Sequence, residues 1–215
     1  MNALRPVLVM LFTPLLALAV PAPAGQITVG GPVAPDGATE LCCDLPAPER
    51  IHNVGSQVDG AGMCVMSSVE MGARYANLEE LRGLRDWCAK QPGGAYPAKV
   101  DRQLAEFCRA RGVPVPEYAQ DEGLGLDTVR AVLQTGRIAC VTYDGRDGVR
   151  YRGRIAHMVC VVHCDEKYVC VLDNNAVGDH DFLWMTPAEF ESRFRGGGGW
   201  AFFWTAPPPP PPPHN

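Results

Sequence analysis

The stretch Gln57-Val-Asp-Gly-Ala-Gly-Met-Cys64-Val-Met-Ser-Ser68 carries a cysteine from a glycine-rich loop into the start of a helical pattern. Small and apolar residues continue that pattern on one helix face, at Val65, Val69, Gly72, Ala73 and Ala76. Cys64 is therefore expected in the first helical turn, where unpaired backbone amides and the helix dipole favour the thiolate over the thiol. A nucleophilic cysteine needs this stabilisation, because the thiolate is the reactive form. A core thiol, or one half of a disulfide, is the other interpretation that this stretch leaves open.

The chain around Cys64 divides into a helical half and a strand half. Beyond the helix that starts at Cys64, helical patterns are predicted at 78–91, 99–111 and 127–135. The hydrophobic period then changes to two, and strands are predicted at 138–143, 155–163, 168–172 and 200–204. Before the last strand, Thr186-Pro187-Ala188-Glu189 has the form of a helix start, with the threonine as cap. Helices first and antiparallel strands second indicate an α+β fold.

A predicted hairpin brings a histidine and a carboxylate together in the strand half. His157 opens one strand, and Asp173 closes the strand that returns from a three-residue turn at Asp165-Glu166-Lys167. This turn puts Asp173 opposite Val159, one diagonal step from His157 and on the same face of the sheet. The carboxylate could then accept the imidazole Nδ1–H and leave Nε2 for a thiol. A two-residue turn would reverse the parity and give this place to Asn174.

The order of these residues along the chain is similar to that of the papain superfamily, and more narrowly to the bacterial papain-like and C39-like peptidases. That pattern has a glutamine, then Gly-x-Cys at the head of a long helix, then a histidine near the start of a strand. An asparagine or aspartate follows 16 residues after the histidine, as Asp173 follows His157 here. The segment 157–174 matches the family's His-x-Val…Tyr-x-x-x-x-Asn/Asp hairpin without a gap. The resemblance covers about residues 57–204, which is most of the chain.

The resemblance implies a papain-like fold, in which an N-terminal helical half with the nucleophile helix packs on a C-terminal antiparallel sheet. It implies Cys64 as the nucleophile, His157 as the base, Asp173 as the orienting group and Gln57 as the oxyanion donor. The expected activity is cleavage of amide bonds in a peptide or protein through a thioacyl-enzyme, with no metal or organic cofactor. The alternatives are a cell-wall peptide amidase or transferase with the same triad, and a catalytically inactive papain-fold binding protein.

The two ends of the chain differ from the segment between them. Residues 1–24 resemble a secretory signal peptide, with one charge at Arg5 and the small residues Ala22-Pro23-Ala24 before Gly25. Their apolar stretch of about 15 residues is shorter than the roughly 20 that span a bilayer, although an uncleaved anchor is the alternative. We therefore expect a secreted or periplasmic protein that is free of the membrane after signal cleavage. The remaining expected parts are an extended leader at 25–50, the peptidase domain at 51–206 and a polyproline tail at 207–215.

Composition and net charge limit both the class of protein and the kind of partner. Hydrophobic residues make up 47% and charged residues 20% of the 215 residues, which fits one globular domain and excludes a wholly disordered or fibrous chain. Lys and Arg total 19 against 24 for Asp and Glu, and the formal net charge is −5. The sequence contains no basic run, so it argues against nucleic acid as a partner.

The nine cysteines form an odd number, so at least one of them cannot pair within the chain. We expect Cys64 to be unpaired. Cys88 and Cys108 fall in separate helical patterns and could link them, while cysteines of the predicted strands could equally be buried thiols. His163 is interpreted as a polar strand end and His180 as part of a solvated loop, so no metal site is predicted.

Overall fold

The structure is a computed structural model that describes residues 27–145, 148–153 and 156–209. The expected signal peptide at 1–24 lies outside the described residues, as does the end of the expected polyproline tail. The α-helices of the described residues are α1 (Cys64–Tyr75), α2 (Leu84–Cys88), α3 (Pro97–Arg111), α4 (Leu126–Gln134) and α5 (Pro187–Gly196). The strands are β1 (Thr28–Gly30), β2 (Tyr118–Asp121), β3 (Ala139–Asp144), β4 (Ala156–Cys164), β5 (Val169–Leu172), β6 (Phe182–Met185) and β7 (Ala201–Trp204). Two short 3-10 turns are η1 (Ala47–Glu49) and η2 (Glu79–Leu81).

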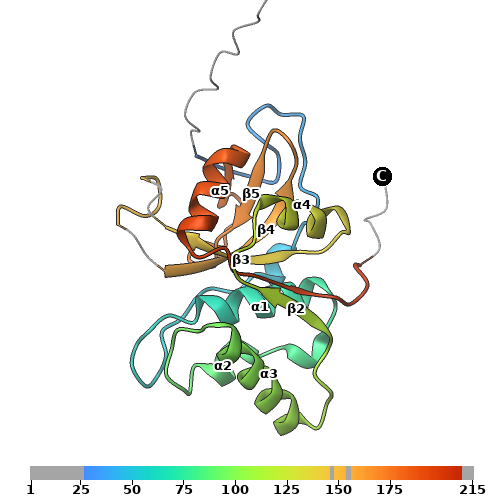
Figure 1. The fold of residues 1–215 in the computed structure, drawn as a ribbon, viewed down its shortest axis with the longest axis vertical. Helices are drawn as coiled ribbons and strands as arrows, with labels where there is room; N and C mark the ends of the chain where they lie inside the picture. Colours follow the sequence, from blue (N-terminus) through green and yellow to red (C-terminus); the bar gives the residue numbers. More distant parts are fainter. Residues whose placement is uncertain (1–26, 146–147, 154–155, 210–215) are drawn as a thin grey trace, which may run out of the picture.

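The strands form one antiparallel sheet in the order β1-β6-β5-β4-β3-β7-β2. Strands β3, β4 and β5 lie at its centre, and β4 and β5 are buried along nearly their whole length. The helical half and the strand half lie in different parts of the molecule, with α1, α2 and α3 in the lower half of Figure 1 and β4, β5, α4 and α5 in the upper half. The α+β prediction is confirmed, and this mixture of helices and antiparallel sheet is consistent with a papain-like fold.

Helix α1 packs directly on the sheet because small residues line the face that meets it. Helix α1 contacts β3, β4 and β7. A Cβ placed on Gly72 would meet the Cys140 Sγ at 3.3 Å and the Trp204 ring at 3.4 Å, so a larger residue there would push the helix away from the sheet. The predicted small-residue stripe therefore serves the close helix–sheet contact that carries Cys64.

The helix predicted at 78–91 is broken into η2 and α2. Gly83 separates them with a φ of 85°, in the left-handed region that favours glycine. The buried Glu70 carboxylate of α1 accepts the backbone N–H groups of Gly83 and Arg85, so a tertiary contact caps α2. The predicted helical period is correct, but the pattern does not reveal the break, because the break depends on Gly83 and on the Glu70 carboxylate.

The hairpin that carries His157 and Asp173 differs from the prediction in two ways that cancel. The Asp165 N–H donates to the Tyr168 carbonyl at 2.9 Å, so the chain reverses over two residues rather than three. A β-bulge at Val162 then shifts the register by one residue. The predicted pairing of Cys164 with Tyr168 is wrong, because Cys164 pairs with Val169.

Beyond the bulge the register is the predicted one. Cys160 pairs with Leu172 and Val161 with Val171. The bulge therefore restores the parity that the shorter turn reverses, and Asp173 rather than Asn174 lies beside His157.

The segment expected as an extended leader contributes to the folded domain from residue 27 onward. Strand β1 pairs with β6 at the edge of the sheet, and Cys43 and Leu45 are buried in the core. The short strands β1, β2 and β6 were not predicted. Each has three or four residues, which is too short for a period-two pattern to stand out.

All nine cysteines lie in the described residues, and none forms a disulfide there. Cys88 and Cys108, which the sequence suggested as a possible link between helices, are buried free thiols. Burial raises the pKa of the Cys88 thiol to about 12. Among the described helices, none is both long and apolar enough to cross a bilayer.

Candidate active site

Two loops set the position of Cys64 at the start of α1. Gly55 and Gly62 form a bridge that closes the loop before the cysteine. The Asp59 carboxylate accepts the N–H groups of Ala61 and of Gly93 from the loop before α3, both at 3.0 Å. A Cβ on Gly93 would lie 2.2 Å from the Ala61 carbonyl oxygen, so only glycine allows the two loops to approach so closely.

The first turn of α1 is held by Asn53 rather than by its own capping residue. Met63 precedes the helix and makes no side-chain cap. Its backbone N–H instead donates to the Asn53 Oδ1 at 2.8 Å. Cys64 follows as the first helical residue and is nearly buried. The sequence prediction that Cys64 lies at a helix start is met.

His157 and Asp173 form a close pair beside Cys64. The His157 Nε2 lies 2.7 Å from the Asp173 Oδ1, and both side chains are buried. The predicted pairing of the residues is therefore present, but the ring nitrogens are exchanged. Nε2 faces the carboxylate, which leaves Nδ1 for the thiol.

The surroundings of His157 favour its charged form. Burial of the ring lowers its pKa, but the hydrogen bonds and charges of Asp173 and Cys64 outweigh burial and raise the pKa to about 9. Burial also raises the pKa of Asp173, and the hydrogen bond and charge of His157 outweigh it, so the pKa of this carboxyl lies below its ordinary value. The pair therefore holds an imidazolium and a carboxylate at neutral pH, with Cys64 next to the cation.

A hydrogen-bonded chain supports the outer side of this pair. The Tyr151 hydroxyl donates to the Asp173 Oδ2 at 2.6 Å and accepts from the Asn175 amide at 2.8 Å. Asn53 in turn donates to the Asn175 Oδ1 at 3.0 Å. The chain thus joins the residue that caps α1 to the carboxylate that orients His157. Such a network restrains both ends at once, because each member is hydrogen-bonded to the next.

Asn174 points away from His157 and into the contact between α1 and the sheet. Its buried Nδ2 lies 3.0 Å from the Cys64 carbonyl, 2.9 Å from the Ser68 Oγ and 2.9 Å from the Met158 carbonyl. Asn174 thereby ties the first turn of the helix to β4. It holds the backbone that carries the thiol and leaves the orientation of the imidazole to Asp173.

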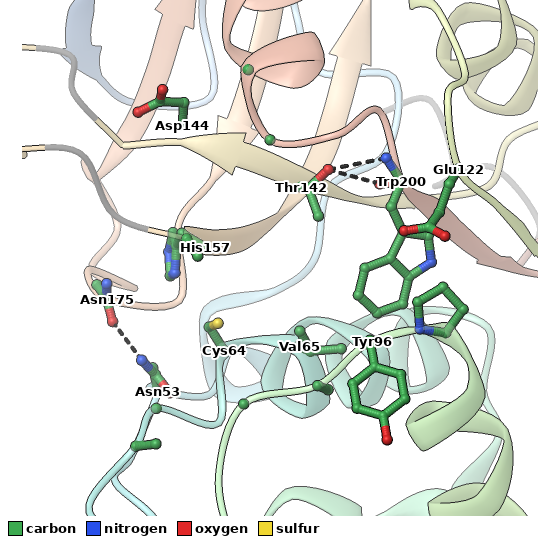
Figure 2. A pocket seen from close by; sticks show the side chains of 18 residues that line it. Asn53, Cys64, Val65, Tyr96, Glu122, Thr142, Asp144, His157, Asn175 and Trp200 are labelled. Carbon is green, nitrogen blue, oxygen red and sulfur yellow. Dashed lines mark hydrogen bonds between the residues drawn. The ribbon is translucent and has the colours of Figure 1, made fainter.

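A cavity of about 620 Å³ opens at Cys64 and His157, between loops of the helical half and strands of the sheet half. Figure 2 shows Cys64 near its middle, with His157, Asn175 and Asn53 on one side and Trp200 and Tyr96 on the other. The complete lining is Asn53, Ala61, Gly62, Cys64, Val65, Gly94, Ala95, Tyr96, Pro97, Glu122, Thr142, Asp144, Ala156, His157, Asn175, Gly196, Gly197 and Trp200. A cavity of this volume, with a thiol and an imidazole in its lining, has room for part of an extended chain.

A buried lysine shapes the wall opposite the sheet. The Lys99 Nζ donates to the carbonyls of Pro92, Gly93 and Gly94 at 2.6 to 2.8 Å. These bonds turn three successive carbonyls inward and away from the cavity, so the loop keeps a fixed course as it passes Cys64. The sequence pattern places Lys99 at the start of a helix but cannot assign it this role.

Gln57 is the predicted site residue that the structure does not bring to the cavity. Its side chain is exposed in a turn, and it is absent from the cavity lining. The loop of Gly55 to Gly62 folds back on itself, which turns Gln57 away from the thiol. The amide nearest to this place comes from Asn53, ten residues before Met63. No motif in the sequence marks Asn53, because its position depends on the way that the loop closes.

Comparison with known proteins gives distant structural similarity alone. No family model and no curated protein matches the sequence. Among solved structures, the fold is similar to that of a candidate C39-like peptidase from Bacillus anthracis, with 11% identity and a TM-score of 0.46. The aligned part covers 79% of this chain and 98% of that chain. At this distance the similarity says nothing about activity, so the assignment of a function depends on the geometry around Cys64.

Proposed function

We propose that this chain is a papain-like cysteine hydrolase that cleaves amide bonds in peptides, with Cys64 as its nucleophile. The observation that supports the proposal is the meeting of Cys64 with the His157–Asp173 pair in one open cavity. The three residues come from a helix start and from two strands, so their meeting is a property of the fold and not of a local sequence motif. Export of the protein, with residues 1–24 as signal peptide, belongs to the same proposal.

The reaction follows from the charges at the site. The Cys64 thiolate attacks the carbonyl carbon of the peptide bond, and the carbonyl oxygen becomes an oxyanion. His157 gives its proton to the departing amine, the C–N bond breaks, and a thioester to Cys64 remains. His157 then takes a proton from water, whose oxygen attacks the thioester and releases the acid. Asp173 stays ionised throughout and holds the imidazole in place.

The chain offers two donors for the oxyanion. The backbone N–H of Cys64 belongs to the first helical turn and has no partner within the helix. The Asn53 amide donates one of its two hydrogens to Asn175, and Asn53 lines the cavity beside Cys64. We assign Asn53 the role that the sequence suggested for Gln57.

The pH dependence of peptide hydrolysis tests the proposed function. The raised pKa of His157 keeps the ring protonated up to about pH 9, and the leaving amine needs that proton. We therefore expect cleavage of a mixed peptide library, followed by mass spectrometry, to fall above an apparent pKa of about 9. Asp173→Asn removes a charge that raises the pKa of His157, so its alkaline limb should move to lower pH.

A Cys64→Ala protein is the control for this assay, and it should show no cleavage at any pH. Hydrolysis that persists in Cys64→Ala would contradict the proposal, and so would a folded protein that cleaves no peptide and leaves Cys64 unreactive toward an epoxysuccinyl probe. Transfer of the acyl group to an added amine, in place of hydrolysis, would favour the transferase alternative.

Asn53 and Gln57 form a matched pair for a test of the oxyanion donor. Asn53→Ala should lower kcat by about 10- to 10³-fold, because a donor to the developing charge is lost. Gln57→Ala should leave kcat within twofold of the starting value, since its side chain is exposed in the turn. The measurement is kcat and KM for one peptide found in the library, with melting temperatures as a folding check. Loss of activity in Gln57→Ala alone would return the role to Gln57.

A further inference from the structure

A second group of cysteine, histidine and aspartate side chains lies away from the cavity, and each side chain contacts the next. The Cys42 Sγ lies 3.1 Å from the His163 Nδ1, and the His163 Nε2 lies 3.1 Å from the Asp165 Oδ2. Cys42 is exposed and does not line the cavity that holds Cys64. His163 is six residues beyond His157 on β4, which separates the two imidazoles by about 20 Å along the strand. We call these three residues the Cys42 cluster.

The β-bulge of the hairpin builds this cluster. Val162 has no partner on β5 in the strand register, and its carbonyl accepts the Cys43 N–H at 2.9 Å. This bond holds the segment before η1 over the end of β4, so that Cys42 meets His163. The Asp165 carboxylate is fixed by the N–H groups of the tight turn, since its Oδ1 accepts from Lys167 and Tyr168.

The cluster is linear, with an ion-pair distance rather than a hydrogen bond between His163 and Asp165. The thiol meets one nitrogen of the imidazole and the carboxylate meets the other, so the ring lies between them and the three groups do not converge on a single point. In agreement, no His, Cys, Asp or Glu side chains of the described residues are grouped to hold a metal ion. The use of the nitrogens is the same as in the first site, with Nδ1 toward sulfur and Nε2 toward the carboxylate.

The charges around Cys42 favour the thiolate. The hydrogen bond from His163 is the largest cause that lowers the pKa of Cys42, and it outweighs burial. Burial lowers the pKa of His163, while Cys42 and Asp165 raise it, and the net shift is upward. The backbone N–H of Cys164 also faces the sulfur. The charge of the Asp165 carboxylate acts in the opposite direction and raises the pKa of Cys42, but the net shift is downward. The Cys43, Cys164 and Tyr75 side chains also interact with this sulfur, and their pKa values are all raised, so they stay neutral at pH 6 to 8.

We propose that Cys42 is a second nucleophilic thiol of this chain, and that it undergoes thiol–disulfide exchange with low-molecular-weight disulfides. Exchange fits the site better than acyl transfer, because it requires only an open approach to the sulfur and no cavity for a peptide. The imidazole and the backbone of Cys164 cover part of the sulfur, which favours a small linear disulfide over a folded partner. This activity is independent of the proposed peptidase.

The exchange step balances in atoms and electrons. The Cys42 thiolate attacks one sulfur of the disulfide RSSR, a new S–S bond to Cys42 forms, the S–S bond of the reagent breaks, and the other half leaves as RS⁻. The leaving thiolate takes the proton from the His163 imidazolium, so RSH is released and His163 becomes neutral. Cys42 is oxidised to a mixed disulfide, and one half of the reagent is reduced to the thiol. Asp165 keeps the imidazolium oriented until the proton departs.

Peptide mapping of a Cys64→Ala protein tests the proposal, since this variant removes the competing thiol. The reduced full chain is incubated with oxidised glutathione at pH 6 to 8, and mixed disulfides are located by mass spectrometry without reduction. We expect Cys42 to be modified first. The other seven cysteines are buried and serve as internal controls.

The rate of modification separates an activated thiol from one that is only exposed. We expect His163→Gln to slow the reaction of Cys42 at pH 6 severalfold, because a higher thiol pKa lowers the thiolate fraction and the greater nucleophilicity of that thiolate offsets only part of the loss. Glutamine can still donate to sulfur but carries no proton to transfer. Within the His163 protein, the rate should rise by less than tenfold per pH unit between pH 6 and 8. This second measurement decides the question if His163→Gln does not fold.

Three results would overturn the proposal. The first is modification of another cysteine before Cys42. The second is a rate that rises a full tenfold per pH unit, as for an unactivated thiol. The third is a product that consists only of disulfide-linked dimers, which would assign Cys42 to a contact between two copies of the chain.

Discussion

In the His157→Ala protein we expect peptide hydrolysis to fall by about 10²- to 10⁴-fold, the range typical of a lost general acid–base group. Alkylation of Cys64 by iodoacetamide at pH 7 should slow as well, since the imidazolium beside the sulfur is the cation that favours the thiolate. Both effects have one cause, because the same ring stabilises the nucleophile and protonates the leaving amine. A time course of Cys64 alkylation and steady-state kinetics of peptide hydrolysis measure the two effects separately.

Removal of His157 also leaves the Asp173 carboxylate buried without its main partner, which by itself destabilises the fold. His157→Gln is therefore the second variant, because its amide can donate to Asp173 but cannot carry a proton to the leaving group. His163→Gln is the matched control on the same strand and should keep its hydrolysis. Unchanged alkylation of Cys64 in a folded His157→Gln protein would show that the two residues do not interact.

The Asn174→Ala protein should be less stable by about 2–3 kcal/mol, because the substitution removes a buried amide that joins the Cys64 and Met158 carbonyls and leaves a cavity between α1 and β4. For a chain of this size, such a loss lowers Tm by roughly 4–12 °C. Asn174→Asp should be at least as destabilising, since a carboxylate would face the carbonyls of Cys64 and Met158 with no proton to donate. Calorimetry measures both variants.

Asn175→Ala is the matched control for this prediction. Asn175 is the next residue along the chain but is exposed, so its loss should cost less than about 1 kcal/mol. An Asn174→Ala protein that melts at the original temperature would show that α1 is held by its packing on the sheet alone. An Asn174→Ala protein that keeps its stability but loses hydrolysis would instead indicate that Asn174 orients His157, as a regular two-residue turn would have it.

The sequence predicts the parts of the site that depend on local patterns. Cys64 is at a helix start because a glycine-rich loop precedes a run with helical period, and both signals are contiguous. His157 and Asp173 could be paired because the number of residues in a hairpin turn sets which residues of the two strands lie opposite each other. The pairing holds because the bulge offsets the shorter turn. Thr186 caps α5 as expected, and its Oγ1 accepts the Glu189 N–H at 3.3 Å. Each of these inferences uses residues that are close in sequence or joined by one turn.

The parts that could not be predicted depend on contacts between distant segments. The position of Asn53 is set by the closure of its loop against the loop of Gly93, and no spacing rule describes that closure. The ring nitrogen that faces Asp173 depends on the side-chain rotamer of His157, which the sequence does not give. The bulge at Val162 has no sequence signal of its own, because valine is equally suited to a regular strand.

That bulge has a consequence for how the length of this hairpin could change. The alignment of His157 with Asp173 depends on whether an even or an odd number of residues lies between them, and turn and bulge each contribute one step to that count. A turn one residue longer without the bulge would give the same alignment as the present turn with it. A change of one residue in the turn therefore keeps this alignment only if the strand gains or loses its bulge at the same time. A single residue inserted or deleted in the turn or in a strand alone would put a neighbour of Asp173 beside His157. The Cys42 cluster depends on the bulge itself, so a hairpin that reached the same parity without it would keep the first site and lose the second.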